Sequence, residues 1–156
     1  MKQGVLIIMT HSEMQAVFEC AEKHYSAKKL EHALMVVTYV EMDPRYMMMT
    51  IEEQNFIRAV AIAHDVIEDT KCSWSELQSG IEDEEERRKF YVVIDLLTHR
   101  HDDTYDGYVD KIIRSKNVFA IMVKQADMKD HLVRKGTLTK KLKEKYLPVM
   151  PKLLRA

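Results

Sequence analysis

Residues 50–70 have the sequence TIEEQNFIRAVAIAHDVIEDT, and this stretch decides the fold class. Thr50 followed three residues later by Glu53 forms a capping box, a pattern with which helices begin. Most of the following residues are apolar, including the whole run from Ala59 to Ala63. A helix that is apolar on most of its faces is buried by its neighbours. The stretch therefore predicts one helix from Thr50 to about Thr70 that is buried on much of its surface.

The sequence on either side predicts further helices, because capping patterns recur while the chain has only 4 glycines and 3 prolines. In the second expected helix, Leu34, Val37 and Tyr39 are expected to point inward. Asp43-Pro44 should end that helix. We expect an all-α fold, a compact single-domain bundle of about seven or eight helices over residues 1–156. The other expected helices are Ser12–His24 with a capping box at Ser12–Gln15, Leu30–Glu41, Ser73 to near Gly80, 84–98, Asp103–Ser115, Asn117–Leu132 and Thr137–Leu154.

Composition excludes several classes of protein. The formal net charge of −1 gives no general attraction to nucleic acid or to anionic membranes, and no apolar run reaches the eighteen residues of a membrane span. The apolar patch at residues 4–9 is too short for a secretory signal, so we expect it to pack on the core. Cys20 and Cys72 form neither a disulfide framework nor a Cys-x-x-Cys zinc-finger pair, which favours a reducing cytoplasm. The basic stretch 134–145 lacks interleaved aromatic residues and is interpreted as a solvated helix face.

Four ionisable residues end the apolar stretch: His64, Asp65, Glu68 and Asp69. On one continuous helix they cover an arc of roughly 140°, and the residues four apart stack on the same side. Such a cluster is unfavourable on a buried helix unless something compensates the charges. A divalent cation does so, and histidine nitrogen and carboxylate oxygen suit Mn²⁺, Fe²⁺ or Zn²⁺. The alternative is a polar helix end facing solvent, but the complete pattern His-Asp-x-x-Glu-Asp-Thr favours a metal-dependent hydrolytic centre.

Further ligands are needed to complete a coordination sphere, and two apolar helical runs carry suitable residues, His32 and Asp127. The order His, His-Asp and a distant Asp resembles the HD superfamily of metal-dependent phosphohydrolases, in which these four positions hold the metal. The resemblance implies that His32, His64, Asp65 and Asp127 are the metal ligands. It spans roughly residues 15–135. Other segments similar to the family are Ala21-x-x-His24, Leu97-Thr98-His99, Tyr105-x-x-Tyr108 and Lys124-x-x-Asp127.

The His-Asp-x-x-Glu-Asp-Thr run most resembles the Rel/Spo-type (p)ppGpp hydrolase domain, including its small stand-alone members. This resemblance implies removal of the 3′-pyrophosphate from guanosine 3′,5′-bis(diphosphate). Mn²⁺ is the implied cofactor, with Fe²⁺, Zn²⁺, Co²⁺ or Mg²⁺ as substitutes. Glu68 and Asp69 would position or deprotonate the attacking water, Lys124 would meet a phosphate, and Thr98 and His99 would line the pocket.

Two departures from the family pattern concern the substrate rather than the metal. The segment between His24 and His32 is short and lacks arginine, so Lys28 and Lys29 are expected to supply the basic contact. His131 stands where the hydrolases commonly carry asparagine, at the contact with sugar or base. Two alternatives stay open: an HD nucleotidase or nucleotide pyrophosphohydrolase with another substrate, and a non-catalytic module that senses a nucleotide. In each case the partner is a small nucleotide, not a nucleic acid or a membrane.

Overall fold

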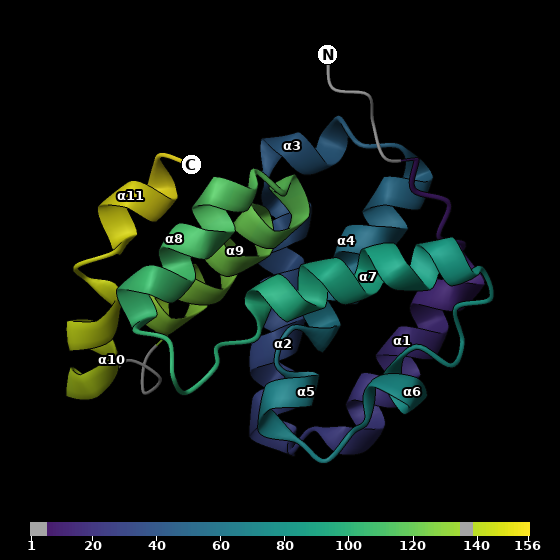
Figure 1. The fold of residues 1–156 in the computed structure, drawn as a ribbon, viewed down its shortest axis with the longest axis horizontal. Coiled ribbons are helices and arrows are strands. Elements are labelled where there is room, and N and C mark those ends of the chain that lie inside the picture. The colour runs from purple at the N-terminus through teal and green to yellow at the C-terminus, as the bar shows by residue number, and fades with distance from the viewer. Residues whose placement is uncertain (1–5, 135–138) are drawn as a thin grey trace.

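The computed structural model describes residues 6–134 and 139–156, and helices dominate both ranges (Figure 1). No β-strand occurs in these ranges, which confirms the all-α expectation. The expected number of seven or eight helices is too low for the described ranges, because a short helix follows Asp43 and two of the expected helices are each divided in two. The helices are α1 (His11–His24), α2 (Ala27–Met42), α3 (Pro44–Met47), α4 (Ile51–Ala63), α5 (Val66–Asp69), α6 (Trp74–Leu77), α7 (Glu84–Leu97), α8 (Tyr105–Ser115), α9 (Val118–Val133), α10 (Lys140–Tyr146) and α11 (Met150–Leu154).

Helix α4 lies at the centre of the packing, as its apolar sequence predicts. It contacts α1, α2, α7 and α9, and every side chain from Ala59 to Ala63 is fully buried. Thr50 and Glu53 form the expected capping box at its start. Phe56 reaches from α4 to the aromatic rings of two neighbours, with ring centroids 6.1 Å from Phe90 and 4.9 Å from Phe119. Burial of these large side chains stabilises the core.

The helix expected over 50–70 is in fact two helices, because α4 ends at Ala63. His64 and Asp65 form a turn, in which Asp65 has φ −109° and ψ 1°, and α5 begins at Val66. The hydroxyl of Tyr25 donates a hydrogen bond to Ile62 O at 2.8 Å and accepts one from the Asp65 N–H at 3.2 Å. This contact comes from the end of α1, so the local sequence does not reveal it. The single-helix arc expected for the four ionisable residues is therefore wrong.

Helices α1 and α2 differ in detail from the expected ones. The capping box of α1 uses Thr10 and Glu13 rather than Ser12 and Gln15. Helix α2 begins at Ala27, earlier than expected, and ends before Asp43-Pro44 as predicted. Its buried face consists of Ala33, Val36, Val37 and Val40. Of the residues expected inward, Val37 is buried and Tyr39 is half-buried, but Leu34 is exposed because it lies one position off this face.

The C-terminal helix expected over Thr137–Leu154 is also divided, into α10 and α11, and Thr137 lies outside the described residues. Pro148 explains the interruption, because proline has no N–H to donate and disfavours helical backbone in the residue before it. Lys152 attaches α11 to α8 through Asp106 at 2.6 Å and Asp110 at 2.7 Å. By contrast, the predicted cap of α9 is confirmed, since the Asn117 side chain accepts the Ala120 N–H at 3.0 Å.

The surface and the N-terminal segment agree with their sequence patterns. Ile7 and Met9 are buried in the core, whereas Leu6 and Ile8 point outward, so the apolar patch packs through alternate residues.

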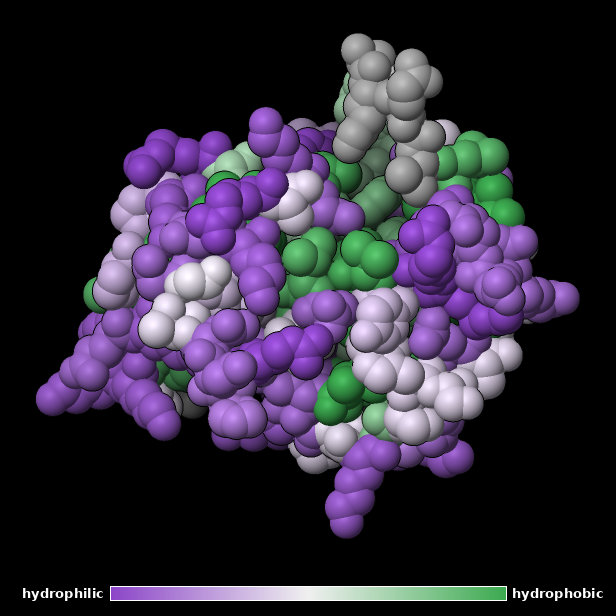
Figure 2. Space-filling model, viewed as in Figure 1, coloured by the Kyte–Doolittle hydropathy of each residue, from purple (hydrophilic) through white to green (hydrophobic). Residues whose placement is uncertain are grey.

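Hydrophilic side chains cover most of the face in Figure 2, and hydrophobic ones gather there only in small patches. Within the described ranges, no helix combines the length and apolar character needed to cross a bilayer.

Candidate metal centre

The four predicted metal ligands converge from three parts of the chain. His32 comes from α2, His64 and Asp65 from the turn after α4, and Asp127 from α9. One donor atom of each lies within 4.8 Å of the donors of the others. His32 Nε2 is 2.8 Å from Asp127 Oδ1, and His64 Nε2 is 3.2 Å from Asp65 Oδ2 and 3.5 Å from Asp127 Oδ1. This largely buried His/Asp group could hold a metal ion.

His64 carries the clearest sign that the group fits a cation. Its Nδ1 donates a hydrogen bond to the carbonyl oxygen of Ala61 at 2.7 Å, so Nε2 is the ring nitrogen that faces the carboxylates. That Nε2 is buried and forms no well-aligned hydrogen bond within the described part of the chain. A buried polar atom whose contacts lack hydrogen-bond alignment is incompletely satisfied, and a wholly unsatisfied one typically costs about 1–3 kcal/mol. A metal ion held by Nε2 and the two carboxylates would satisfy all three groups.

His32 is held between two carboxylates of α9. Its Nε2 faces Asp127, and its Nδ1 lies 2.6 Å from Asp130 Oδ2. Asp130 is fully buried and also accepts a hydrogen bond from Arg134 Nη2 at 2.8 Å. A carboxylate on the second nitrogen of a ligating histidine fixes its tautomer and orientation. Asp130 was not among the predicted site residues, although its position three residues after Asp127 places both on one face of the helix.

The ionisation states of the group follow from its burial and its contacts. Burial lowers the pKa values of His32 and His64, but the adjacent carboxylates outweigh burial and raise both, that of His64 well above its ordinary value. Burial raises the pKa of Asp127, but Lys124 and the two imidazoles hold it well below its ordinary value. Burial likewise opposes ionisation of Asp65, and His64 lowers its pKa. The carboxylates are therefore ionised, the form in which they bind a metal.

Lys124 neutralises part of this charge from within the core. Its side chain is buried, and its Nζ lies 2.8 Å from Asp127 Oδ2 and 5.1 Å from the ring centroid of Tyr108. Burial lowers the pKa of Lys124, but Asp127 and the surrounding tyrosines raise it well above its ordinary value. Lys124 is thus a buried cation beside the candidate ligands, and it also lines the adjoining cavity.

A cavity of about 680 Å³ adjoins the His/Asp group. Most of the predicted site residues line it: Lys28, Lys29, His32, Asp65, Glu68, Asp69, His99, Lys124, Asp127 and His131. Thr98 does not, because its hydroxyl donates a hydrogen bond to Ile94 O at 2.8 Å, within its own helix turn. His64 does not line the cavity either; it lies in the buried His/Asp group. The prediction that Thr98 lines the pocket is therefore not met.

The acid pair after the turn is held by two different parts of the chain. Glu68 Oε1 accepts a hydrogen bond from the His99 N–H at 2.9 Å, and Asp69 Oδ2 accepts one from Lys29 Nζ at 3.0 Å. Burial is the main reason why the pKa of Glu68 is raised. Lys29 was expected to supply a basic contact to the substrate, and here it pairs with Asp69 while still lining the cavity. Lys28 lines the same cavity from the exposed start of α2.

One wall of the cavity was not foreseen and consists of aromatic and basic residues. Tyr105 and Tyr108 of α8 face Tyr146 and Lys145 of α10, and the ring centroids of Tyr105 and Tyr146 are 5.6 Å apart. Lys145 Nζ lies 4.5 Å from the Tyr105 ring centroid, and burial is the main cause of its lowered pKa. Lys145 and Arg134 both line the cavity. The interpretation of the basic stretch 134–145 as a solvated helix face is therefore wrong for these two residues. The spacing Tyr105-x-x-Tyr108 was an available signal, since residues three apart share a helix face.

His131 occupies the end of the cavity nearest the ligands. Its ring centroid lies 4.5 Å from that of His32 and 5.5 Å from that of Tyr146. Its Nε2 is 3.6 Å from Asp127 Oδ1, and burial lowers its pKa. His131 therefore contacts two of the candidate ligands, His32 and Asp127, and also lines the cavity that a substrate would enter.

No protein-family model matches this chain, and no curated protein matches its sequence significantly. The fold and the site thus define the protein as an all-α-helical chain with a buried His/Asp group that could hold a metal ion, beside a cavity that carries both acidic and basic side chains.

Proposed function

We propose that the protein is a metal-dependent nucleotide phosphohydrolase of the HD superfamily. The observation that supports this most directly is one cavity that joins a His/Asp ligand group, a separate acid pair and several basic side chains. These are the parts that hydrolysis of a phosphate ester requires: a cation, a proton acceptor and positive charge for the phosphates. Within this class, we propose that it removes the 3′-pyrophosphate from guanosine 3′,5′-bis(diphosphate).

The proposed cofactor is Mn²⁺, with Fe²⁺, Zn²⁺, Co²⁺ or Mg²⁺ as substitutes. His32, His64, Asp65 and Asp127 would hold it, since nitrogen and carboxylate oxygen donors suit such ions. When bound, the ion would supply Lewis acidity, lowering the pKa of water and offsetting phosphate charge.

Glu68 is the proposed proton acceptor for the attacking water. Its raised pKa brings it nearer to neutral pH, which suits a group that takes up a proton and later releases it. The His99 N–H fixes the orientation of one Glu68 oxygen. Asp69, held by Lys29, would help to orient the same water.

The remaining cavity residues match a phosphorylated nucleotide in charge and shape. Lys28, Lys124 and Lys145 bring positive charge to the cavity, which a pyrophosphate group requires. Tyr105 and Tyr146 present aromatic surface in the same cavity, against which a base can pack. These features support a nucleotide more than a small inorganic phosphate compound.

A second candidate is a phosphohydrolase of the same kind with another nucleotide as substrate. The specific observation in its favour is His131, which lies between the His32 and Tyr146 rings where the resembling hydrolases commonly carry asparagine. The connection between α1 and α2 is also short, consisting of Tyr25 and Ser26. Both features alter the part of the cavity that would receive the sugar and base.

A substrate panel separates these proposals. The purified protein with Mn²⁺ is incubated with ppGpp, pppGpp, GTP, GMP, deoxynucleoside triphosphates and cyclic nucleotides, and phosphate and pyrophosphate release are measured. Pyrophosphate released from ppGpp and pppGpp alone supports the alarmone hydrolase. Phosphate released from GMP, or hydrolysis of another nucleotide, supports the second candidate. Binding without turnover in all the metals named above would overturn the proposal of an enzyme and support a nucleotide-sensing module.

A further inference from the structure

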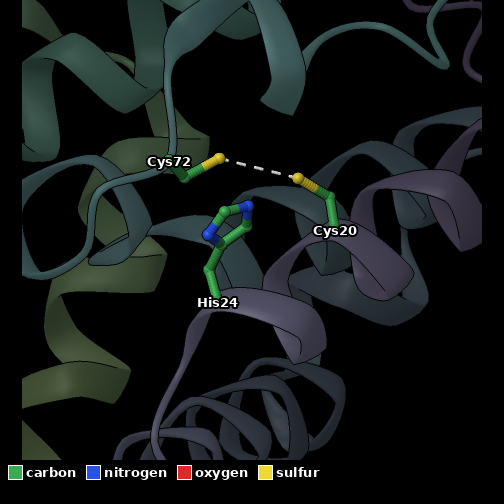
Figure 3. Close-up of side chains that lie close together, drawn as sticks. All are labelled: Cys20, His24 and Cys72. Atoms are coloured by element: carbon green, nitrogen blue, oxygen red, sulfur yellow. Dashed lines mark hydrogen bonds between the residues drawn. The ribbon is translucent and has the colours of Figure 1, made fainter.

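A second group of metal-binding side chains lies outside the cavity (Figure 3). Cys20 and His24 come from the last turns of α1, and Cys72 comes from the segment between α5 and α6. One donor atom of each lies within 4.8 Å of the donors of the others. Figure 3 shows the His24 ring beside the gap between the two sulfur atoms. We propose that Cys20, His24 and Cys72 bind a zinc ion that fastens this segment to α1.

The distance between the sulfur atoms supports ligation. Cys20 Sγ and Cys72 Sγ are 3.6 Å apart, and both cysteines are free thiols. In tetrahedral zinc sites the Zn–S bond is about 2.3 Å, which places two sulfur ligands roughly 3.8 Å apart. The two thiols are thus already at nearly the separation that a shared zinc ion requires.

The three residues are well placed by their elements. Cys20 and His24 are four residues apart on α1 and therefore share one helix face. Cys72 is buried, and its N–H donates a hydrogen bond to the Thr70 hydroxyl at 3.1 Å, which fixes its backbone. The sequence separation of 52 residues between the cysteines explains why no local zinc-finger spacing reveals the group.

Glu76 of α6 completes the surroundings of the group. Its Oε2 lies 2.7 Å from His24 Nε2. A carboxylate beside a ligating histidine orients the ring, and its negative charge also favours a cation at this place. Glu76 therefore acts as a positioning residue in the proposed site.

The donors also indicate which metal is taken. Two thiolates and an imidazole are soft and borderline ligands, which favour zinc over manganese. The His/Asp group beside the cavity offers only nitrogen and oxygen donors. Two thiolates balance the double charge of the ion. The two groups would thus sort different metals, and the zinc site does not depend on the proposed hydrolase function.

The consequence of zinc binding would be structural. Cys72 is linked through Thr70 to α5, because the Thr70 hydroxyl also donates a hydrogen bond to Val66 O at 2.6 Å. Helix α5 carries the acid pair, and α1 leads into Tyr25, which holds the His64–Asp65 turn. A zinc ion would therefore join the two segments that position the acid pair and the turn.

Cobalt substitution tests the site without reference to activity. The reduced, metal-free full chain is titrated with Co²⁺, and the thiolate-to-cobalt charge-transfer absorption is followed. We expect the band to saturate at one thiolate-bound Co²⁺ per chain, after one equivalent in the His64→Gln background, and Zn²⁺ to abolish it. The band should be lost or strongly weakened in Cys20→Ser and in Cys72→Ser. It should be retained in His64→Gln, which is altered only in the His/Asp group beside the cavity. Circular dichroism checks that each variant is folded.

Absence of the band in excess Co²⁺, while a thiol assay counts both cysteines as reduced, would overturn the proposal. So would a band that persists in the Cys20→Ser/Cys72→Ser double variant. Thermal unfolding supplies a second measurement, in the His64→Gln background. Zn²⁺ in hundredfold excess over its Kd should raise the melting temperature by about 5–10 °C, and Cys72→Ser should abolish that rise.

Discussion

At the scale of single residues, the polar groups behind the candidate ligands decide how the ligands are held. The order of His32, His64, Asp65 and Asp127 along the sequence was enough to select them, and the structure brings their donor atoms together. Their hydrogen-bond partners could not be selected in this way. Asp130 is one carboxylate among many in the sequence, and only the packing of α2 against α9 places it on His32.

Asp130→Asn tests this positioning role. The variant keeps all four candidate ligands but replaces a charged acceptor on His32 Nδ1 with a neutral amide. We expect the Mn²⁺ affinity to fall about 10–100-fold, as is typical for loss of such a partner. Isothermal titration calorimetry measures it, with Asp106→Asn on the surface of α8 as the control. An unchanged Kd for Asp130→Asn would show that His32 is oriented by packing alone.

Glu68→Gln separates catalysis from metal binding. The amide oxygen can still accept the His99 N–H, but the side chain can no longer take a proton. We expect kcat to fall by about 10²–10⁴-fold, the usual contribution of a general base, with Mn²⁺ occupancy unchanged. The exposed Glu85→Gln on α7 is the matched control. Hydrolysis as fast as in the parent would remove Glu68 from the proposed mechanism.

At the scale of helices, some starts that depend on neighbouring residues were predictable, although those of α1 and α2 were misplaced, and breaks that depend on tertiary contacts were not. Thr50 and Asn117 cap their helices as the sequence predicts, because the cap and its acceptors lie within one turn. The break after Ala63 depends on Tyr25, far away in the sequence. The division after Tyr146 had a local signal in Pro148, which the prediction of one long helix overlooked.

Tyr25→Phe tests whether the tyrosine hydroxyl holds the His64–Asp65 turn. The variant removes both hydrogen bonds of the hydroxyl, the one it donates to Ile62 O and the one it accepts from the Asp65 N–H. We expect a loss of about 1–3 kcal/mol in the free energy of unfolding. Each kcal/mol should lower the melting temperature by about 2–4 °C.

Thermal unfolding in a chelator measures this loss, and titration with Mn²⁺ should show weaker binding because the turn carries two ligands. Tyr91→Phe, on the half-exposed face of α7, is the control for removing a tyrosine hydroxyl. If Tyr25→Phe melts with the parent, the turn does not depend on the hydroxyl.

At the scale of the whole molecule, the all-helical core follows from the hydrophobic pattern, but the cavity does not. Its walls come from α2, α5, α8, α9 and α10, and from the segment that contains His99. A sequence pattern identifies the buried face of each helix, yet it does not say which surface lysines meet across the fold. The sequence alone therefore predicts a solvated Lys145, whereas its Nζ in fact lies over the Tyr105 ring.

Glu86 of α7 gives a pH-dependent prediction for the whole fold. Its side chain is fully buried, and its Oε1, which accepts no hydrogen bond from the described residues, lies 3.7 Å from Lys89 Nζ. Burial is the main cause of its raised pKa. A carboxyl group whose pKa is raised on folding binds its proton more tightly in the folded state. The free energy of unfolding therefore falls as the pH rises from the ordinary glutamate pKa of 4.5 through the raised value.

Glu86→Gln removes this dependence, because glutamine stays neutral while keeping an acceptor for the Ile8 N–H. We expect the melting temperature of the variant relative to the parent to increase from pH 4 to pH 7.5. Differential scanning calorimetry at both pH values measures the difference, with the exposed Glu84→Gln as the control. A difference that stays constant across this range, or decreases, would contradict the expected titration of Glu86.

The aromatic and basic wall supplied by α10 has a consequence for the order of assembly during protein synthesis. The ribosome delivers all four candidate ligands by residue 127, whereas Lys145 and Tyr146 follow only later. A nascent chain would thus contain its whole candidate metal-binding group before the α10 side of the cavity exists. Binding of a metal ion at the candidate site and enclosure of the cavity would therefore be separable in time, and we expect a chain halted after α9 to allow the first and lack the second.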